Sequence, residues 1–245
     1  MMLLIDAGNT RVKWALAEDG AALGTWSATG AVVHAGLDAV HEDWMGATRV
    51  LVSNVAGPAL AERIAALLPA HAQVEWFAST PQRAGVTNGY RDPARLGCDR
   101  FAAAIGARAL APGQDLIVAT CGTATTVDAV RADGHFIGGM ILPGLALMAA
   151  SLARNTAQLP QVDAGALPPL FGDNTHDAIL SGLLSAQAGA IERAVAGLGG
   201  AFCIVSGGAG PHIAPALKIA HQVVDNIVLV GLHAAATGST GDMRC

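Results

Sequence analysis

Charged, aromatic and cysteine residues are all scarce in this chain of 245 residues. Charged side chains make up 13% and aromatic ones 4%, so a core must be built mainly from alanine, valine, leucine and isoleucine. The net charge is −5 and no cluster of lysine and arginine exceeds two residues, which argues against nucleic acid as a partner. An acidic protein can still bind an anion, because backbone N–H groups and a single lysine determine the local field.

The cysteines and histidines show no metal-binding pattern. The four cysteines lack any CxxC pair, and the eight histidines are scattered along the chain. This usage fits a reducing compartment and provides no disulfide framework. The apolar residues 2–5 are too few for the core of a signal peptide and meet Asp6 at once. We therefore expect a cytoplasmic protein.

One uncharged run, residues 136–153, is 18 residues long and reaches the threshold for a membrane candidate. Gly138, Gly139, Pro143 and Gly144 interrupt it, and the pieces on either side match a strand followed by a helix. We expect a buried strand and helix here and no membrane span.

The most informative segment is DAGNTRVK, residues 6–13, which follows the apolar run 2–5 directly. Asp6 can hold a hydrated Mg²⁺, and Gly8 lets the backbone approach an anion closely. Backbone N–H groups with Asn9, Thr10 and Lys13 can bind phosphoryl oxygens. The segment matches neither a Walker loop nor a dinucleotide fingerprint. The alternative is a β-hairpin whose tight turn simply favours Gly-Asn.

A second copy of this pattern favours a nucleotide site. Residues 116–128, LIVATCGTATTVD, again join an apolar strand, a small-residue turn and a strand of β-branched residues. At a constant offset of 114 positions, Gly8 falls on Gly122, Asn9 on Thr123 and Asp6 on Thr120. Both copies continue into a third run of strand character, at 22–28 and 136–142. Repetition at half the chain length predicts two related domains whose glycine turns grip a polyphosphate from both sides.

The order of predicted elements supports this duplication. Each half begins with three strands and continues with alternating helices and strands, which resembles the duplicated ribonuclease-H-like α/β architecture of the actin, Hsp70 and acetate and sugar kinase superfamily, with a central cleft. The break APGQ near residue 112 predicts domains at 1–112 and 113–245. We expect a polar excursion at 80–93, a helix at 96–110, a long helix at 176–197, a last helix at 227–237 and a frayed tail from 238.

Five further groups have both a functional and a plain reading. In GCDR, residues 97–100, Asp99 can accept a hydroxyl proton and Arg100 can bind a carboxylate; the alternative is a helix-start Asp beside a solvated Arg. SGGAG, residues 206–210, resembles a turn for adenosine or is an ordinary strand-to-helix connection. Asn174 and Thr175 are good helix N-cap chemistry. Tyr90, the only tyrosine, lines a pocket or packs at its rim. Asp128 on the outgoing strand is a supporting carboxylate or an exposed strand residue.

Five motifs, taken in order, resemble type III pantothenate kinases, a family related in sequence to the Bvg accessory factor proteins. They are DxGNTxxK at 6–13, GxDR at 97–100, a CGTAT turn at 121–125, GGxIxPG at 138–144 and Asn-Thr before the long helix. The resemblance runs over nearly the whole chain, from Met2 to about Ala236. It implies ATP-dependent phosphorylation of the primary hydroxyl of pantothenate to 4′-phosphopantothenate, the first step of coenzyme A biosynthesis.

The resemblance also implies residue roles. Asp6 would be the Mg²⁺ ligand, and Asp99 would be the catalytic base that accepts the hydroxyl proton. Thr123 would contact ATP from the opposite domain. The implied ATP-binding residues are Asp6, Ala7, Gly8, Asn9, Thr10, Arg11, Val12, Lys13, Gly122 and Thr123. The implied pantothenate-binding residues are Tyr90, Gly97, Cys98, Asp99, Arg100 and Thr175.

The family further implies a homodimer with the pantothenate pocket near the subunit interface. Many members carry Asp at the first position of the second phosphate motif, where it binds a monovalent cation. Thr120 stands there in this chain, and a neutral hydroxyl replaces a carboxylate poorly, so a requirement for K⁺ or NH₄⁺ is in doubt.

Two rival functions stay open from the sequence. One is a regulatory or interaction protein of the accessory-factor type, which would have no reason to keep Asp6, Lys13, Asp99 and Arg100 together. The other is a kinase or phosphatase of the same superfamily that acts on another small alcohol or acid. The joint presence of the four side chains favours an enzyme over the regulatory protein, and only the family resemblance of GCDR disfavours the second rival.

Overall fold

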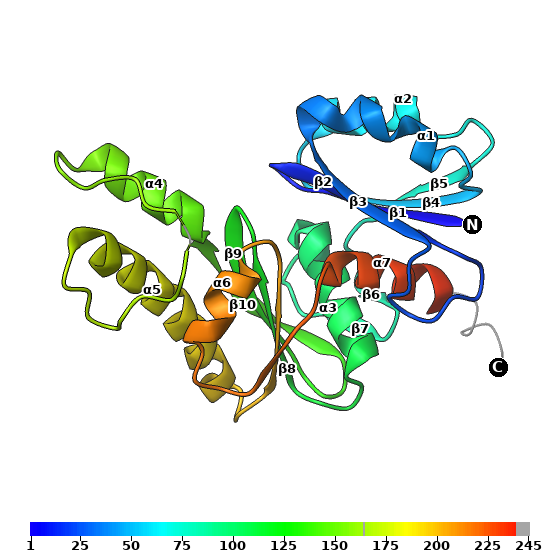
Figure 1. The fold of residues 1–245 in the computed structure, drawn as a ribbon. Coiled ribbons are helices and arrows are strands. Elements are labelled where there is room, and N and C mark those ends of the chain that lie inside the picture. The colour runs from blue at the N-terminus through cyan, green and yellow to red at the C-terminus, as the bar shows by residue number, and fades with distance from the viewer. Residues whose placement is uncertain (164, 239–245) are drawn as a thin grey trace. The chain divides into compact units, whose positions relative to one another are not determined.

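The computed structural model describes residues 1–163 and 165–238, which form two compact units. The first unit contains residues 1–110 together with the C-terminal helix that starts at Ile227, and the second unit runs from Ala111 to Asn226. Each unit is built around a mixed sheet with helices packed on it (Figure 1). The expected tail beyond residue 238 lies outside the described residues.

The sheet of the first unit has the strand order β3-β2-β1-β4-β5. The central strand β1 (Met2–Ala7) is antiparallel to β2 (Arg11–Ala17) and parallel to β4 (Arg49–Asn54). Strands β3 (Ala28–Val33) and β5 (Gln73–Trp76) form the two edges. Strand β1 is buried along almost all of its length, which explains its nearly continuous apolar sequence MLLI.

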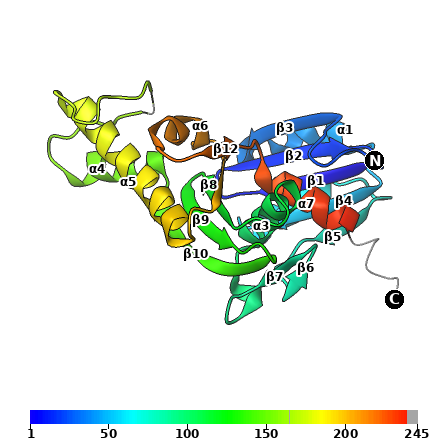
Figure 2. The same ribbon diagram turned by 90° about the horizontal axis from the view of Figure 1, so that it is seen from below.

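Helices cover both faces of this sheet (Figure 2). The 3₁₀ helix η1 (His34–Val40), α1 (His41–Trp44) and α2 (Pro58–Leu67) lie on one face. Helices α3 (Cys98–Leu110) and α7 (Ile227–Thr237) lie on the other. Because side chains alternate along a strand, the odd-numbered residues of β1 join the core under η1, α1 and α2. Fully buried members of this core include Leu3, Ile5, Leu37, Trp44 and Ile64.

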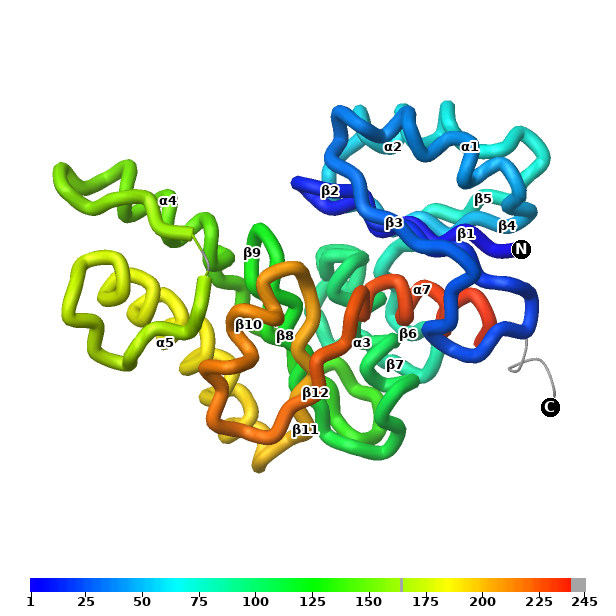
Figure 3. The backbone as a smooth tube through the Cα atoms, in the orientation of Figure 1, coloured from blue at the N-terminus to red at the C-terminus, as the bar shows by residue number. Residues whose placement is uncertain are grey.

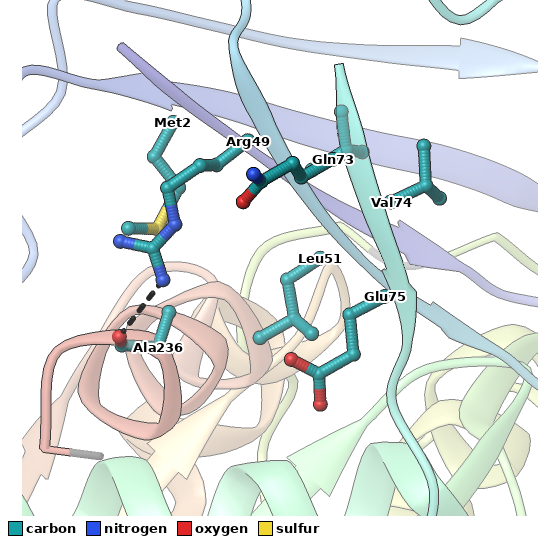
Figure 4. Close-up of a pocket in the computed structure, with 8 residues that line it drawn as sticks. Met2, Arg49, Leu51, Gln73, Val74, Glu75 and Ala236 are labelled. Carbon is teal, nitrogen blue, oxygen red and sulfur yellow. Dashed lines mark hydrogen bonds between the residues drawn. The ribbon is translucent and has the colours of Figure 1, made fainter. Parts of the chain in front are cut away.

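Helix α7 packs beside α3, although we expected it to close the second domain. At the crossing, a Cβ on Gly106 would lie 2.6 Å from the Ile227 carbonyl oxygen, and one on Gly231 would overlap the Ala102 carbonyl. Only glycine permits this backbone-to-backbone approach. The end of α7 is also held, because Arg49 donates to the Ala236 carbonyl oxygen over 3.3 Å (Figure 4). Opposite ends of the chain thus lie side by side (Figure 3).

Two further differences from the sequence expectations concern this unit. Strand β3 begins at Ala28, whereas we predicted a strand over 22–28. Gly20 and Gly24 have φ of +80° and +74°, so residues before Ala28 form turns instead. The polar excursion at 80–93 is more regular than expected. It contains the hairpin β6 (Gln82–Arg83) and β7 (Val86–Asn88), and then η2 (Pro93–Arg95).

The second unit repeats the strand order of the first as β10-β9-β8-β11-β12. Strand β8 (Leu116–Cys121) is antiparallel to β9 (Ala124–Val130) and parallel to β11 (Phe202–Ser206). Strand β10 (His135–Pro143) lies beside β9, and β12 (His221–Val223) forms an edge next to β11. No sequence pattern predicted β12. The matching order and directions confirm the predicted duplication and the fold class.

The helices of the second unit build an apolar core against β8 and β9. They are α4 (Leu145–Asn155), α5 (Thr175–Gly197) and the short α6 (Gly210–Ile213) with η3 (Ala214–Ala216). The uncharged run 136–153 is divided between β10 and α4, as its glycines and proline predicted. Among the described residues, no helix combines the length and apolar character that a bilayer crossing requires.

Candidate active site

Asp6 stands near the end of the central strand β1, opposite Lys13 on β2 and Ser53 on β4. Burial raises the pKa of Asp6 to about 7, against the lowering effect of the Lys13 ammonium. The Asp99 carboxylate raises this pKa further. An ammonium and two carboxylates therefore influence one another within the first unit, at the carboxyl end of β1.

The turn that follows Asp6 is not the tight hairpin turn that favours Gly-Asn. Gly8 donates its N–H to the Arg11 carbonyl oxygen over 3.1 Å, but no residue from Gly8 to Arg11 has a positive φ. A type I′ turn needs positive φ at both central residues, so the turn is not of that type, although β1 and β2 do form a hairpin. A Cβ on Gly8 would meet nothing closer than the Arg11 carbonyl oxygen at 3.4 Å. The protein itself therefore does not require glycine here, whereas a closely approaching anion would.

The side chains of this turn divide by exposure. Asn9, Thr10 and Arg11 are exposed, while Ala7 and Val12 belong to the core. Of the expected ATP-binding segment, Ala7 and Val12 can therefore offer only their backbone groups.

Helix α3 begins at Cys98 and places Asp99 in its first turn. The Asp99 carboxylate accepts the Arg100 N–H over 2.8 Å, and a Cβ on Gly97 would lie 2.7 Å from the same oxygen. Glycine at 97 thus makes room for the carboxylate. Burial raises the pKa of Asp99, while the backbone N–H and the charge of Arg100 act in the opposite direction. A carboxyl group with a raised pKa is a stronger base than an ordinary Asp.

The start of α3 is fixed to the end of β4 by hydrogen bonds. The Cys98 thiol lies 3.3 Å from the Ser53 hydroxyl and donates to the Asn54 carbonyl oxygen over 3.6 Å. Burial raises the pKa of Cys98, so the thiol stays protonated and can donate. Ser53, which is fully buried, therefore lies between Asp6 and the helix that carries Asp99.

Arg100 is buried and faces Tyr90. Its Nη1 donates to the Tyr90 hydroxyl over 2.7 Å, and its guanidinium lies 5.6 Å from the centre of the ring. Buried Asn88 holds together the segment that carries Tyr90, because its Nδ2 donates to the carbonyl oxygens of Thr80 and Pro93 at the two ends of that segment. Arg100 is thus an ordered cation rather than the solvated side chain of the plain reading.

The second glycine turn lies between β8 and β9. Gly122 donates to the Ala124 carbonyl oxygen over 2.9 Å, and Gly144 donates to the Thr123 carbonyl oxygen over 2.9 Å. A Cβ on Gly144 would overlap Gly122, and one on Gly207 would overlap Cys121. The glycines of the later motifs thus pack directly against the Gly122–Thr123 turn.

An apolar pocket of about 220 Å³ opens beside the SGGAG turn of the second unit. Gly208, Ala209 and His212 form one part of its wall. The rest comes from α4, α5 and the loop before α5: Leu145, Ala146, Ala149, Val162, Asp163, Leu180 and Leu183. A flat, weakly polar group matches this lining.

Thr175 is exposed at the first position of α5. Asn174 caps this helix, since its side-chain oxygen accepts the Asp177 N–H over 3.0 Å. Asn174 therefore has the capping role of its plain reading. Asp128 on β9 is buried, which excludes its reading as an exposed strand residue.

A family model described as type III pantothenate kinase matches residues 2–197. The chain belongs to the type III pantothenate kinase family.

Curated relatives support this membership over almost their full length. The type III pantothenate kinase of Herminiimonas arsenicoxydans is 54% identical, covering 96% of this chain and 97% of that protein. The type III pantothenate kinase of Janthinobacterium is 53% identical, with the same coverage of both chains. Membership of this family makes the chain an enzyme, a phosphotransferase.

Solved structures confirm the fold. A conserved putative Baf family transcriptional activator from Campylobacter jejuni aligns with a TM-score of 0.65 at 19% identity, covering 97% of this chain and 98% of that one. A putative 2-dehydro-3-deoxygalactonokinase from Sinorhizobium meliloti aligns with a TM-score of 0.62 at 18% identity, covering 98% and 100%. At these identities the likeness extends to the fold alone.

The chemistry of the first unit fits a divalent cation. No group of three or more His, Cys, Asp or Glu side chains that could hold a metal occurs among the residues described, so a metal bound by protein side chains alone is not expected. Mg²⁺ commonly binds through one or two carboxylates together with substrate phosphates and water. Asp6 can supply one such carboxylate. Burial disfavours its ionised form, and the positive charge of Lys13 offsets part of that effect.

Of the site residues predicted from the type III pantothenate kinase motifs, the first unit contains Asp6, Lys13, Asp99, Arg100 and Tyr90. Gly122, Thr123 and Thr175 belong to the second unit. Sequence reasoning missed Ser53, although it is the last residue but one of β4, the strand parallel and adjacent to β1. That position was a usable signal, because ligands bind at the carboxyl ends of parallel strands.

Proposed function

We propose that this protein transfers the γ-phosphoryl group of ATP to the primary hydroxyl of pantothenate, giving 4′-phosphopantothenate in the first step of coenzyme A biosynthesis. One observation carries the proposal. The Asp6–Lys13 pair and the start of α3 lie close enough for the Asp99 charge to raise the pKa of Asp6. A phosphate-binding turn and a base for an alcohol are therefore neighbours. The names of the curated relatives support pantothenate as that alcohol.

Asp99 is the proposed catalytic base. Its carboxylate accepts the hydroxyl proton while the hydroxyl oxygen bonds to the γ-phosphorus, the bond to the bridging oxygen breaks, and ADP leaves. Because phosphoryl transfer has a loose transition state, the hydroxyl loses its proton to Asp99 late in the reaction, and alignment of the reactants supplies most of the rate enhancement. Arg100 binds the pantothenate carboxylate, and Tyr90 orients Arg100 through the 2.7 Å hydrogen bond. Gly97, Cys98 and Thr175 complete the proposed pantothenate site.

The proposed ATP site begins at the Gly8 turn. Within the first unit, Asn9, Thr10 and Arg11, all exposed, donate to phosphoryl oxygens together with Lys13. Gly122 and Thr123, in the second unit, are the other proposed ATP-binding residues. Asp6 holds Mg²⁺, which when bound neutralises phosphoryl charge. The apolar pocket beside Gly208 and Ala209 takes the adenine ring, since its lining suits a flat heterocycle.

We propose that activity does not depend on K⁺ or NH₄⁺. Thr120 occupies the position where many family members carry the cation-binding Asp. Its hydroxyl is buried, and so is that of Thr126 on the neighbouring strand, so this position offers neutral oxygens only.

We infer that the protein is a cytoplasmic homodimer. Four large apolar side chains of the second unit are strongly exposed: Ile141 at 66%, Leu147 at 50%, Leu170 at 69% and Phe171 at 88%. Exposed apolar surface of this kind marks association sites, and Leu170 and Phe171 lie close in sequence to Thr175. Three free cysteines among the described residues suit a reducing compartment.

A coupled ADP-release assay tests the function. We expect ADP release from Mg²⁺–ATP that depends on pantothenate, with at most weak release on sugars or acetate. Release that is equal with and without pantothenate would remove the proposed substrate, and preference for a sugar or acetate would assign the enzyme to another kinase class. The accessory-factor alternative is not favoured, because the 53–54% identical relatives carry the kinase name.

A further inference from the structure

His34 lies beside the phosphate turn, although no motif includes it. It is the first residue after β3, whose last residue, Val33, pairs with Arg11 at the start of β2. This register puts residue 34 next to the Gly8–Arg11 turn. The His34 ring nitrogen Nε2 lies 2.9 Å from the Gly8 carbonyl oxygen. Since a carbonyl oxygen only accepts, Nε2 must carry the hydrogen and donate it.

This hydrogen bond fixes the orientation of one peptide group in the turn. In a trans peptide, the C=O of one residue and the N–H of the next point in opposite directions. Holding the Gly8 carbonyl on the His34 side therefore aims the Asn9 N–H away from His34. Asn9 is exposed, and its N–H is one of the donors proposed for phosphoryl oxygens. The turn has no left-handed residue that would fix this peptide in another way.

His34 is itself held from behind. Arg63 on α2 donates from Nη1 to the His34 carbonyl oxygen over 2.9 Å. The same guanidinium pairs with Asp38 on η1 at 3.4 Å. The imidazole thus extends from an anchored backbone to the turn.

We propose that His34 is a positioning residue for the phosphates of ATP, acting through the Gly8–Asn9 peptide group. It does not touch substrate itself. The proposal rests on the assignment of the Gly8 turn to ATP, and it adds a residue outside the motif of residues 6–13.

The test compares His34→Ala with a matched control, His41→Ala. The His41 ring Nδ1 lies 2.9 Å from the Leu67 carbonyl oxygen, so it makes the same kind of bond at the same length, but not to the turn. We expect His34→Ala to raise the KM for ATP about 10-fold, the effect of losing one orienting hydrogen bond. The kcat at saturating ATP and the KM for pantothenate should stay within 2-fold or so. His41→Ala should leave all three constants near wild type.

A rescue variant separates orientation from packing. His34→Gln keeps an N–H donor and should bring the KM for ATP back to within about 3-fold of wild type. His34→Phe keeps the ring volume without the donor, and it takes the place of His34→Ala should that variant not fold. A role in stability alone would lower the melting temperature of both alanine variants and leave the KM for ATP unchanged.

Two measurements keep this inference distinct from the proposed function. Pantothenate-dependent ADP release by wild type, with an unchanged KM for ATP in His34→Ala and His34→Phe, would overturn the role of His34 and leave the function intact. If wild type ignores pantothenate, the function fails, and equilibrium titration with Mg²⁺–ATP decides about His34. A Kd about 10-fold weaker in His34→Ala and His34→Phe supports the inference, whereas an unchanged Kd overturns it.

Discussion

The two glycine turns have nearly the same backbone and opposite chemistry. In the first unit, Asp6 on the central strand β1 pairs with Lys13 on the neighbouring strand β2. In the second unit, Thr120 occupies the matching place on β8 and pairs with Thr126 on β9. Thr126 is the partner because the loop between β8 and β9 is one residue shorter than the loop between β1 and β2. The constant sequence offset would have paired Lys13 with Val127, so only the strand register reveals the true counterpart. A charged pair in one unit is therefore a pair of neutral hydroxyls in the other.

The next strand shows that the scaffold is nonetheless shared. Ser53 lies opposite Asp6 on the parallel neighbour β4, and Ser206 lies opposite Thr120 on the parallel neighbour β11. Both serines are buried. We infer that the duplicated fold supplies two places to bind phosphate, and that the charges needed for metal binding and proton transfer are confined to the first.

The largest expected effect tests whether proton transfer depends on a charged group of the first unit. Asp99→Asn should lower kcat roughly 10²–10⁴-fold, the usual range for loss of a general base, because the amide cannot take up the hydroxyl proton. The variant should keep its melting temperature and its KM for ATP. Steady-state ADP release checks this, with Asp43→Asn as control, since Asp43 is an exposed acid in the first turn of α1. Full activity of folded Asp99→Asn would end its assignment as the base.

The next effect contrasts the helices of the two units. Gly231→Ala puts a methyl group into the Ala102 carbonyl oxygen at the α3–α7 crossing, so we expect a loss of about 3 kcal/mol in the free energy of unfolding. Gly182 lies on α5 with no atom within 4 Å of an added Cβ. Gly182→Ala should therefore stabilise the protein by up to about 1 kcal/mol.

Thermal melting of both glycine variants provides the measurement. The Gly231→Ala transition should fall by roughly 6–12 °C, at 2–4 °C for each kcal/mol. Because α3 carries Asp99, activity should fall with it. An unchanged melting temperature would mean that α7 does not pack as described.

A third prediction separates function from stability at the first turn. The folded-state pKa of Asp6 is raised from its ordinary value to about 7, so the folded protein holds this proton more tightly than the unfolded chain. The contribution of Asp6 to stability is thus favourable below about pH 4 and is lost as the pH rises through 7. Asp6→Asn does not titrate, and at pH 8 it should be more stable than wild type by on the order of 1–2 kcal/mol in the absence of nucleotide and Mg²⁺.

The same substitution should reduce kcat/KM for ATP, since the amide is a poor Mg²⁺ ligand. Melting curves at pH 5 and pH 8 check the sign: the advantage of Asp6→Asn should be larger at pH 8. Added Mg²⁺–ATP should raise the wild-type melting temperature more than that of the variant. A pH-independent difference would contradict the burial of the Asp6 charge.

The contrast also shows what can be predicted from one sequence. The turns at Gly8 and Gly122 were visible because each follows an apolar strand directly, and so was the helix start at Asp99. Tertiary contacts could not be seen in this way. The membership of α7 in the first unit depends on Gly106 and Gly231 meeting across a crossing that joins distant parts of the chain.

Short edge elements and single side chains were also beyond reach. Strand β12 spans only His221–Val223, too short for a clear alternating pattern. The predicted position of strand β3 was wrong because Gly20 and Gly24 have left-handed φ, which cannot be read from the apolar character of the segment. His34 belongs to no motif, and its bond to Gly8 follows only from the register of β3 with β2.

The smallest expected effect concerns the neutral turn itself. The Thr120 hydroxyl is buried and makes no hydrogen bond to any described residue, and such a group costs free energy. Thr120→Val keeps the shape and removes the hydroxyl, so we expect a gain of about 1 kcal/mol in stability. Activity in K⁺ and in Na⁺ should agree within 2-fold or so for both proteins, because no carboxylate stands at position 120. If Thr120→Val instead loses stability or activity when K⁺ is present, the hydroxyl binds a cation or a phosphoryl oxygen. The second turn would then share the chemistry assigned here to the first turn alone, and the division between the units would have to be redrawn.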